Sequence, residues 1–140
     1  MKILALHGFR TSGEIFSMQT GAFRYHLGLD LVCVNAPHPA SGPCDPMVQQ
    51  IYSSYAKYEW FARSDTDKSQ AVAMKDASLK YLLDLIAEKG YFEGILGFSQ
   101  GAAMATVLLE HYRSNDLPCP FKFAIMIAGV EPKIFYPEVS

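Results

Sequence analysis

Cysteine is scarce in this sequence, and the three cysteines present form neither a disulfide framework nor a metal-binding pattern. Cys33, Cys44 and Cys119 lie far apart, and no C-x-x-C pair or histidine-rich spacing accompanies them. Cys33 lies in an apolar stretch, where a thiol is most simply a small core side chain. The sequence therefore gives no support to redox chemistry or to a zinc site, and we expect no metal.

An excess of one charge and long apolar runs are also lacking. The 12 lysines and arginines nearly balance the 14 aspartates and glutamates, and the formal net charge is −2. The basic residues form no run, which argues against nucleic acid as a partner. No apolar run approaches the roughly 20 residues of a membrane span, and the run at the N-terminus is too short for the core of a signal peptide. We therefore expect a soluble, intracellular protein with no membrane partner.

Phosphate-binding glycine motifs are absent as well. Neither G-x-x-x-x-G-K-[ST] nor G-x-G-x-x-G follows an apolar strand. A nucleotide-binding domain of flavodoxin-like shape is therefore the weakest of three hypotheses for this chain. No internal repeat or low-complexity tract divides the sequence, and 50% of its 140 residues are apolar. We expect residues 1–140 to belong to a single domain with a sizeable core.

What the sequence does contain is a G-x-S-x-G pentapeptide at residues 97–101, between an apolar strand and a helix of small apolar residues. A serine on such a sharp strand-to-helix turn is exposed as a nucleophile, at a helix N-terminus that favours developing negative charge. The turn requires Gly97 and Gly101, because a side chain at either position would collide with the neighbouring strand or helix. Ser99 is the candidate catalytic nucleophile, and a purely structural turn is the alternative.

Strands and helices alternate along the rest of the chain. Apolar runs predict strands at residues 2–6, 31–34, 92–98 and 121–127. Helices are predicted from a capping box at Thr11 and Glu14 to Leu27, from 69 to 89, and from Ser99 to about 114, with Gly28 and Gly90 ending the first two. Continuously apolar strands that alternate with helices indicate an α/β fold, with a mostly parallel sheet covered on both faces.

In such a sheet, ligands bind beyond the carboxyl ends of the strands, where the strand order reverses. Strands 2–6 and 92–98 are expected to flank this point. An acyl-transfer site needs two backbone donors for the oxyanion, one after the nucleophile and one in the loop after an earlier strand. We assign them to the amides of Gln100 and Phe9, with Gly8 allowing close approach. Arg10 could equally supply the second donor, and Phe9 could instead be only a core anchor.

The four histidines include no convincing general base. In this architecture the base follows the serine, in the chain order Ser, Asp or Glu, His. His7, at the end of the first strand, is therefore expected to be a structural residue. His26 within a helix, His38 in a proline-rich loop and His111 near the end of the helix after Ser99 are expected to be structural or exposed.

Residues 36–68 form a connection much longer than the usual ~2 to 6 residues. Its first part contains Pro37, Pro39, Pro43 and Pro46, and its second part contains the aromatic residues Tyr52, Tyr55, Tyr58, Trp60 and Phe61. So many aromatic side chains argue for packing over disorder. We interpret the connection as a lid or wall of an apolar substrate pocket, with the alternative that the aromatic residues merely cover the sheet edge.

The chain also contains four diagnostic sequence blocks: Leu6–Gly13, Asn35–His38, Trp60–Phe61 and Gly97–Ala102. Together they resemble the FSH-type serine hydrolases, small α/β-hydrolases, over nearly the whole chain. The resemblance implies a hydrolase of small-molecule esters or thioesters with a Ser-Asp-His triad and no cofactor, located in the cytosol, with the nucleus left open as a second location. The last block alone is also similar to acyl-protein thioesterases and related carboxylesterases. From the first and third blocks, we expect Arg10 and Trp60 to bind substrate.

The chain departs from this family pattern after the fourth predicted strand. Members of the family continue with a strand that ends in the catalytic aspartate and another that precedes the catalytic histidine. Here only Asp116 and His111 of these residue types follow Ser99. We therefore expect an N-terminal portion of a hydrolase domain, incomplete at its C-terminal end, with activity near background and an uncovered apolar edge strand. The alternative is a pseudo-hydrolase that binds an acyl ligand or a partner protein without turnover, and the oligomeric state stays open.

Overall fold

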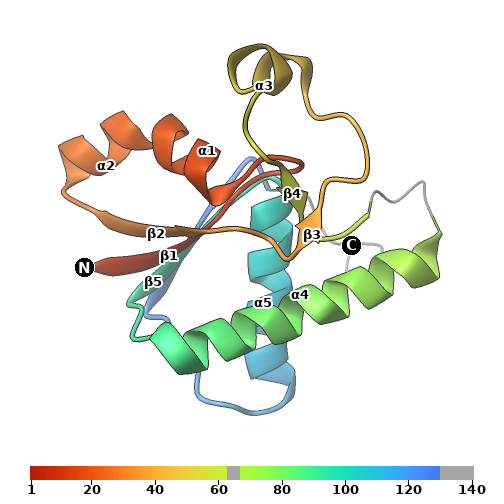
Figure 1. Cartoon of the computed structure of the whole chain (residues 1–140). Coiled ribbons are helices and arrows are strands. Elements are labelled where there is room, and N and C mark those ends of the chain that lie inside the picture. The colour runs from red at the N-terminus through yellow and green to blue at the C-terminus, as the bar shows by residue number, and fades with distance from the viewer. Residues whose placement is uncertain (63–66, 130–140) are drawn as a thin grey trace.

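The central sheet consists of four parallel strands in the order β2-β1-β5-β6 (Figure 1). The computed structural model describes residues 1–62 and 67–129. Its sheet strands are β1 (Lys2–Leu6), β2 (Asp30–Val34), β5 (Gly94–Phe98) and β6 (Phe123–Ile127). The predicted α/β fold and all four predicted strands are confirmed, and the predicted strand ends lie close to the observed ones.

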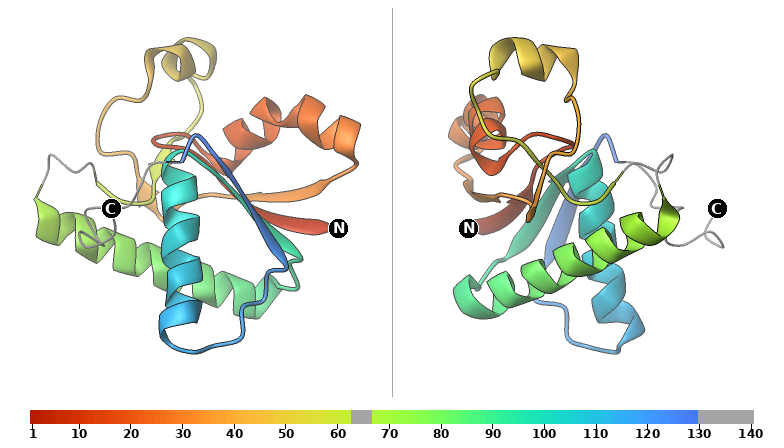
Figure 2. Two further views of the ribbon diagram at one scale, coloured as in Figure 1. Left: turned by 180° about the vertical axis from the view of Figure 1, so that it is seen from behind. Right: turned by 45° about the vertical axis from the view of Figure 1, so that its right-hand side comes forward.

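Helices cover both faces of this sheet, as its apolar strands require. Their bounds are α1 (Gly13–Gln19), α2 (Gly21–Leu27), α4 (Lys68–Lys89) and α5 (Gln100–Ser114). Side chains alternate along β1, so that Ile3 and Ala5 pack with α1 and α2 while Leu4 and Leu6 pack with α4 and α5. Figure 2 shows the two pairs of helices on opposite sides of the sheet. None of the described helices is both long and apolar enough to cross a bilayer.

The strand order reverses between β1 and β5, as the sequence predicts. From β1 the chain goes to β2 on one side, and β5 is added on the other side of β1. The two strands are in register at their carboxyl ends, where Leu6 lies opposite Gly97. The loop after β1 and the turn after β5 therefore begin at neighbouring positions, at the edge where open parallel sheets bind ligands.

The single helix predicted between Thr11 and Leu27 is two helices, and the predicted capping box is wrong. Ser12 caps α1, because its hydroxyl accepts a hydrogen bond from a first-turn amide at 3.1 Å. The break between α1 and α2 lies at Thr20, whose hydroxyl donates to a main-chain carbonyl one turn earlier at 2.7 Å. Such a local bond competes with continued helical geometry. Gly28 ends α2 in the left-handed conformation, as predicted.

The long connection contains three short elements that the sequence did not predict. They are β3 (His38–Pro39), the helix α3 (Pro46–Ile51) and β4 (Tyr58–Glu59), and β3 pairs with β4 antiparallel. Residues 63–66 of the connection lie outside the described residues. In Figure 1 this connection lies next to the carboxyl ends of β1 and β5. It is therefore placed where a wall of the site would have to be.

Strand β6 forms one edge of the sheet, and within residues 1–62 and 67–129 it pairs only with β5. Met126 is 39% exposed and Ile127 is 42% exposed. Apolar side chains on a strand with an open side favour pairing with another strand. The expected apolar edge is present, and such an edge predicts marginal stability or self-association.

Candidate active site

Ser99 occupies a strained turn between β5 and α5. Its backbone has φ 55° and ψ −115°, a combination that costs a non-glycine residue about 1–3 kcal/mol. The turn is held in place from the edge strand, because the Ser99 amide donates to the carbonyl oxygen of Ile127 at 2.9 Å. The strain and its support match the strand, nucleophile and helix geometry that the pentapeptide predicts.

Both glycines of the pentapeptide are sterically required. A Cβ added at Gly97 would lie 2.6 Å from the Cα of Ala102, inside the first turn of α5. A Cβ added at Gly101 would lie 2.1 Å from the carbonyl oxygen of Leu6 and 2.5 Å from that of His7. The sequence-based reason for the two glycines is therefore confirmed. The Gly101 contact also shows that the start of α5 packs directly on the end of β1.

The two residues assigned to the oxyanion hole lie on segments that this packing brings together. Gln100 is the first residue of α5, where amides have no acceptor within the helix. Phe9 follows Gly8 in the loop after β1, and a Cβ added at Gly8 would lie 3.0 Å from the ring of Phe98. The loop of Phe9 thus lies against the residue that precedes Ser99. Donation of the two amides to an oxyanion stays a prediction.

His7 is a buried, neutral structural residue, as expected. Its Nδ1 lies 2.8 Å from the carbonyl oxygen of Gly8, and its Nε2 accepts a hydrogen bond from the Ala36 amide at 2.9 Å. Burial lowers its pKa from 6.5 to about 4, although the contact with the Gly8 carbonyl acts in the opposite direction. With both ring nitrogens engaged, His7 has no nitrogen left to take a proton from Ser99.

The other three histidines are not positioned to act as the base for Ser99 either. His111 lies 12 residues after Ser99 in the chain, and 12 residues of α-helix span about 18 Å. The Nε2 of His38 lies 3.0 Å from the carbonyl oxygen of Met74 on α4. His26 is exposed on α2. None of the four histidines in the described part of the chain is paired with Ser99.

Arg10 is held by the protein itself. Its Nε donates to Oε1 of Glu59 at 3.0 Å, and its terminal nitrogens donate to the carbonyl oxygen of Pro43 at 3.0 Å and to Oγ of Ser41 at 3.2 Å. The guanidinium carbon also lies 4.4 Å from the centre of the Phe9 ring. These contacts differ from the substrate contact expected of Arg10, because they direct its donors into the protein. Binding of substrate by Arg10 stays a prediction that the geometry does not favour.

Trp60 is fully buried, which also departs from the expected contact with substrate. Its indole N–H donates to the carbonyl oxygen of His7 at 2.9 Å, and its ring lies 5.2 Å from that of His7. Its carbonyl oxygen accepts from the hydroxyl of Ser78 on α4 at 2.6 Å. Trp60 therefore joins β1 to α4 in the core. Among the aromatic residues of the connection, it fits the covering interpretation rather than the pocket wall.

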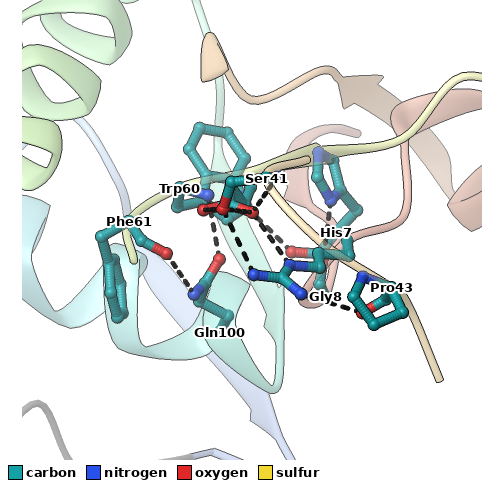
Figure 3. Close-up of polar contacts among 9 residues, drawn as sticks. His7, Gly8, Ser41, Pro43, Trp60, Phe61 and Gln100 are labelled. Atoms are coloured by element: carbon teal, nitrogen blue, oxygen red, sulfur yellow. Dashed lines mark hydrogen bonds and ion pairs between the residues drawn. The ribbon is translucent and has the colours of Figure 1, made fainter. Parts of the chain in front are cut away.

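The side chain of Gln100 has a function that the sequence did not reveal. Its Oε1 accepts from the Trp60 amide and its Nε2 donates to the carbonyl oxygen of Phe61, both at 2.9 Å. Figure 3 shows this amide beneath the backbone of residues 60 and 61. The residue after the nucleophile thus fastens the segment that follows β4 to the start of α5.

Glu59 and Ser41 are the other site residues that sequence reasoning missed. Glu59 is fully buried, and its Oε1 accepts from the Ser41 amide at 2.9 Å in addition to Arg10. One signal was available, because Glu59 is a lone acidic residue in an aromatic run. A charged residue in such a run is rarely buried without a partner of opposite charge.

A surface cavity of about 450 Å³ lies elsewhere, between α1 and β2. Its walls come from Gly13, Glu14, Ser17, Met18, Leu31, Cys33 and Asn35. No residue of the turn around Ser99 lines it. Burial raises the pKa of Cys33 to about 11, so the thiol in this wall is protonated and unreactive.

Residues 1–138 match the model of the serine hydrolase (FSH1) family. The chain belongs to this family. The match covers the strained serine, both glycines and the loop after β1, so the family assignment and the observed geometry rest on the same residues.

Two curated relatives and one solved structure illustrate the likeness. Esterase OVCA2 from Bos taurus is 34% identical, and the match covers 95% of this chain and 65% of that protein. Rhodanese-like domain-containing protein 6 from Arabidopsis thaliana is 32% identical over 94% of this chain and 26% of that protein. The crystal structure of esterase PE8 has a TM-score of 0.60 and 27% identity, over 93% of this chain and 58% of that chain. The chain thus spans less than two thirds of each of these proteins.

Proposed function

We propose that this chain supplies the nucleophile and the oxyanion hole of a serine hydrolase that cleaves small-molecule carboxylic esters or thioesters. One observation carries the proposal: Ser99 sits in a strained turn whose flanking glycines allow α5 and the end of β1 to meet. A strain of this kind persists only where the surrounding structure holds it, and it collects at functional sites. Membership of the FSH1 family and the likeness to esterases support the same reaction class.

In the proposed reaction, Oγ of Ser99 attacks the acyl carbonyl carbon, and its proton passes to a base. The negative charge that forms on the carbonyl oxygen is held by the amides of Phe9 and Gln100. The alkoxide or thiolate then leaves with a proton, and an acyl group remains on Ser99. Water attacks that acyl-enzyme and releases the carboxylic acid.

Within residues 1–62 and 67–129, no histidine is placed to act as this base. His7 and His38 form hydrogen bonds with other residues, and His26 is exposed on α2. His111 is the only histidine of residues 1–140 that follows Ser99. In a serine protease that lacks triad members, catalysis of about 10³ to 10⁴-fold over water remains. We therefore propose that residues 1–140 alone hydrolyse esters with no more than this residual acceleration, which is near background compared with a complete serine hydrolase. The same observation favours a second candidate, a protein that binds an acyl ligand without turnover.

A fluorophosphonate probe separates the two candidates, because it modifies a serine only where that serine is activated. The natural gene product that contains these 140 residues is incubated with the probe, and the modified peptide is identified by mass spectrometry. We expect modification of Ser99, none in Ser99→Ala, and unchanged labelling in Ser54→Ala, which removes an exposed serine outside the turn. Absence of labelling in the natural protein would favour the binder and overturn the hydrolase.

A further inference from the structure

A buried ion pair joins the loop after β1 to β4 in the long connection. Arg10 and Glu59 lie 49 residues apart in the chain, yet Nε of Arg10 is 3.0 Å from Oε1 of Glu59. The Glu59 side chain is 0% exposed and that of Arg10 is 10% exposed.

The other side-chain hydrogen bonds of this pair go to one segment, residues 41–43. Ser41 donates to both carboxylate oxygens of Glu59 at 3.1 Å, and Arg10 donates to Ser41 and to Pro43. A Cβ added at Gly42 would lie only 2.4 Å from a terminal nitrogen of Arg10, so the backbone of residues 41–43 closes directly on the guanidinium. All three nitrogens of the Arg10 guanidinium group therefore donate hydrogen bonds to acceptors within the protein.

One partner of the ion pair, Arg10, is the residue next to the candidate oxyanion donor Phe9. Arg10 immediately follows Phe9, and its own backbone has φ 53°, which lies in the left-handed region. A non-glycine residue keeps this conformation only where its surroundings hold it. The next residue is held as well, because the carbonyl oxygen of Thr11 accepts from the amide of Tyr58 at 2.6 Å.

We propose that Glu59 is a positioning residue for the reaction at Ser99: through Arg10 it fixes the loop that presents the Phe9 amide to the turn. This inference rests on the proposed function. Glu59 touches neither Ser99 nor a substrate in this role. A buried ion pair contributes little net stability compared with a well-packed apolar pair, but its directional bonds fix geometry.

The expected effect is on the chemical step. Removal of one oxyanion-hole donor lowers kcat by about 10² to 10³-fold, and displacement of a donor is expected to cost part of this, tenfold or more. Because the oxyanion forms only as the reaction proceeds, kcat should fall while KM changes little. A residue that served only stability would instead change the fraction of folded protein, and the folded molecules would react at the normal rate.

The test uses the natural gene product that contains these residues and compares wild type with Ser99→Ala and three further variants. Glu59→Gln removes the charge of the carboxylate, and Arg10→Met with Glu59→Met replaces the pair by apolar side chains of similar length. Asp84→Asn is the matched control, because it removes the carboxylate of an exposed ion pair with Lys80 on α4. The second-order rate of fluorophosphonate labelling is measured at Ser99 and divided by the folded fraction from circular dichroism. In this reaction Oγ of Ser99 gives its proton to the base and bonds to phosphorus, the P–F bond breaks as fluoride leaves, and the phosphonyl oxygen occupies the oxyanion site.

We expect labelling at least tenfold slower than wild type in Glu59→Gln and in the double methionine variant, and a wild-type rate in Asp84→Asn. If either folded variant at Glu59 labels within twofold of wild type, the positioning role is wrong although the hydrolase stands. If neither variant folds, the pair is required for folding itself and the positioning role is equally overturned. If the wild-type protein labels no faster than Ser99→Ala, the proposed function fails and this inference fails with it.

Discussion

Mild acid should destabilise this protein through His7. The imidazole is buried in neutral form, and its Nε2 already accepts a hydrogen bond from the amide of Ala36. A proton added at Nε2 would face that amide hydrogen, and the new charge would have no solvent around it. The folded state therefore resists protonation, and the pKa of His7 falls from 6.5 to about 4.

The sign and size of the effect follow from this pKa. Between pH 6.5 and pH 4, the unfolded chain binds a proton at His7 that the folded chain does not. The stabilising contribution of His7 is therefore complete above pH 6.5 and is lost as the pH falls toward 4. With about 1.4 kcal/mol per unit of pKa difference, the loss is about 2 kcal/mol at pH 5 and about 3 kcal/mol at pH 4.

Urea unfolding between pH 7 and pH 4 measures this loss, and Trp60 is a built-in probe. It is the only tryptophan of the chain, and its ring lies 5.2 Å from that of His7. Carboxylates also titrate in this range, so the loss in wild type is compared with that in His7→Gln, which cannot be protonated. His26→Gln, at an exposed position on α2, is the matched control and should behave as wild type. Equal losses in wild type and His7→Gln would refute the reasoning.

Three further predictions concern the turn, its neighbour and the sheet edge. Gly101→Ala should destabilise the protein by about 3 kcal/mol or more, because the added Cβ would lie 2.1 Å from a backbone oxygen of β1. Thermal unfolding of Gly21→Ala, where nothing lies within 4 Å, is the comparison. Gln100→Leu should cost about 2 to 4 kcal/mol in urea unfolding, because it leaves the buried amide of Trp60 without its acceptor and removes a hydrogen bond to the carbonyl oxygen of Phe61. Met126→Lys should reduce self-association of residues 1–140 in sedimentation experiments, because a charge on an edge strand opposes pairing.

Each of these predictions has a result that contradicts it. Equal melting temperatures for the two glycine variants would mean that the contact at β1 is easily relieved. A Gln100→Leu protein as stable as wild type would show that water replaces the side chain. If Met126→Lys self-associates as strongly as wild type in sedimentation experiments, β6 is not the strand through which the molecules associate.

The turn around Ser99 could be predicted from sequence because its causes are local. Two glycines and a serine within five residues, between an apolar run and a helix, are enough to specify it. The sheet strands were predictable for the same reason, since a continuous apolar run predicts a strand that is covered on both faces.

The surroundings of the turn could not be predicted in this way. The partners Arg10 and Glu59 are 49 residues apart, and no local pattern relates two positions at that distance. The strands β3 and β4 have two residues each, too few for an alternating pattern. An aromatic residue near a site suits either a pocket wall or a core, and for Trp60 it is the full burial and the contacts with His7 and Ser78 that decide for the core.

The most direct test of the central claim is to trap the acyl group on Ser99. The natural gene product that contains these residues is mixed with p-nitrophenyl butyrate, quenched in acid within one turnover and digested for mass spectrometry. The account predicts one butyryl group on the peptide that contains Ser99, and none in the Ser99→Ala variant, which should also lose ester hydrolysis. Hydrolysis that persists in Ser99→Ala, or a butyryl group found only on another residue, would contradict it.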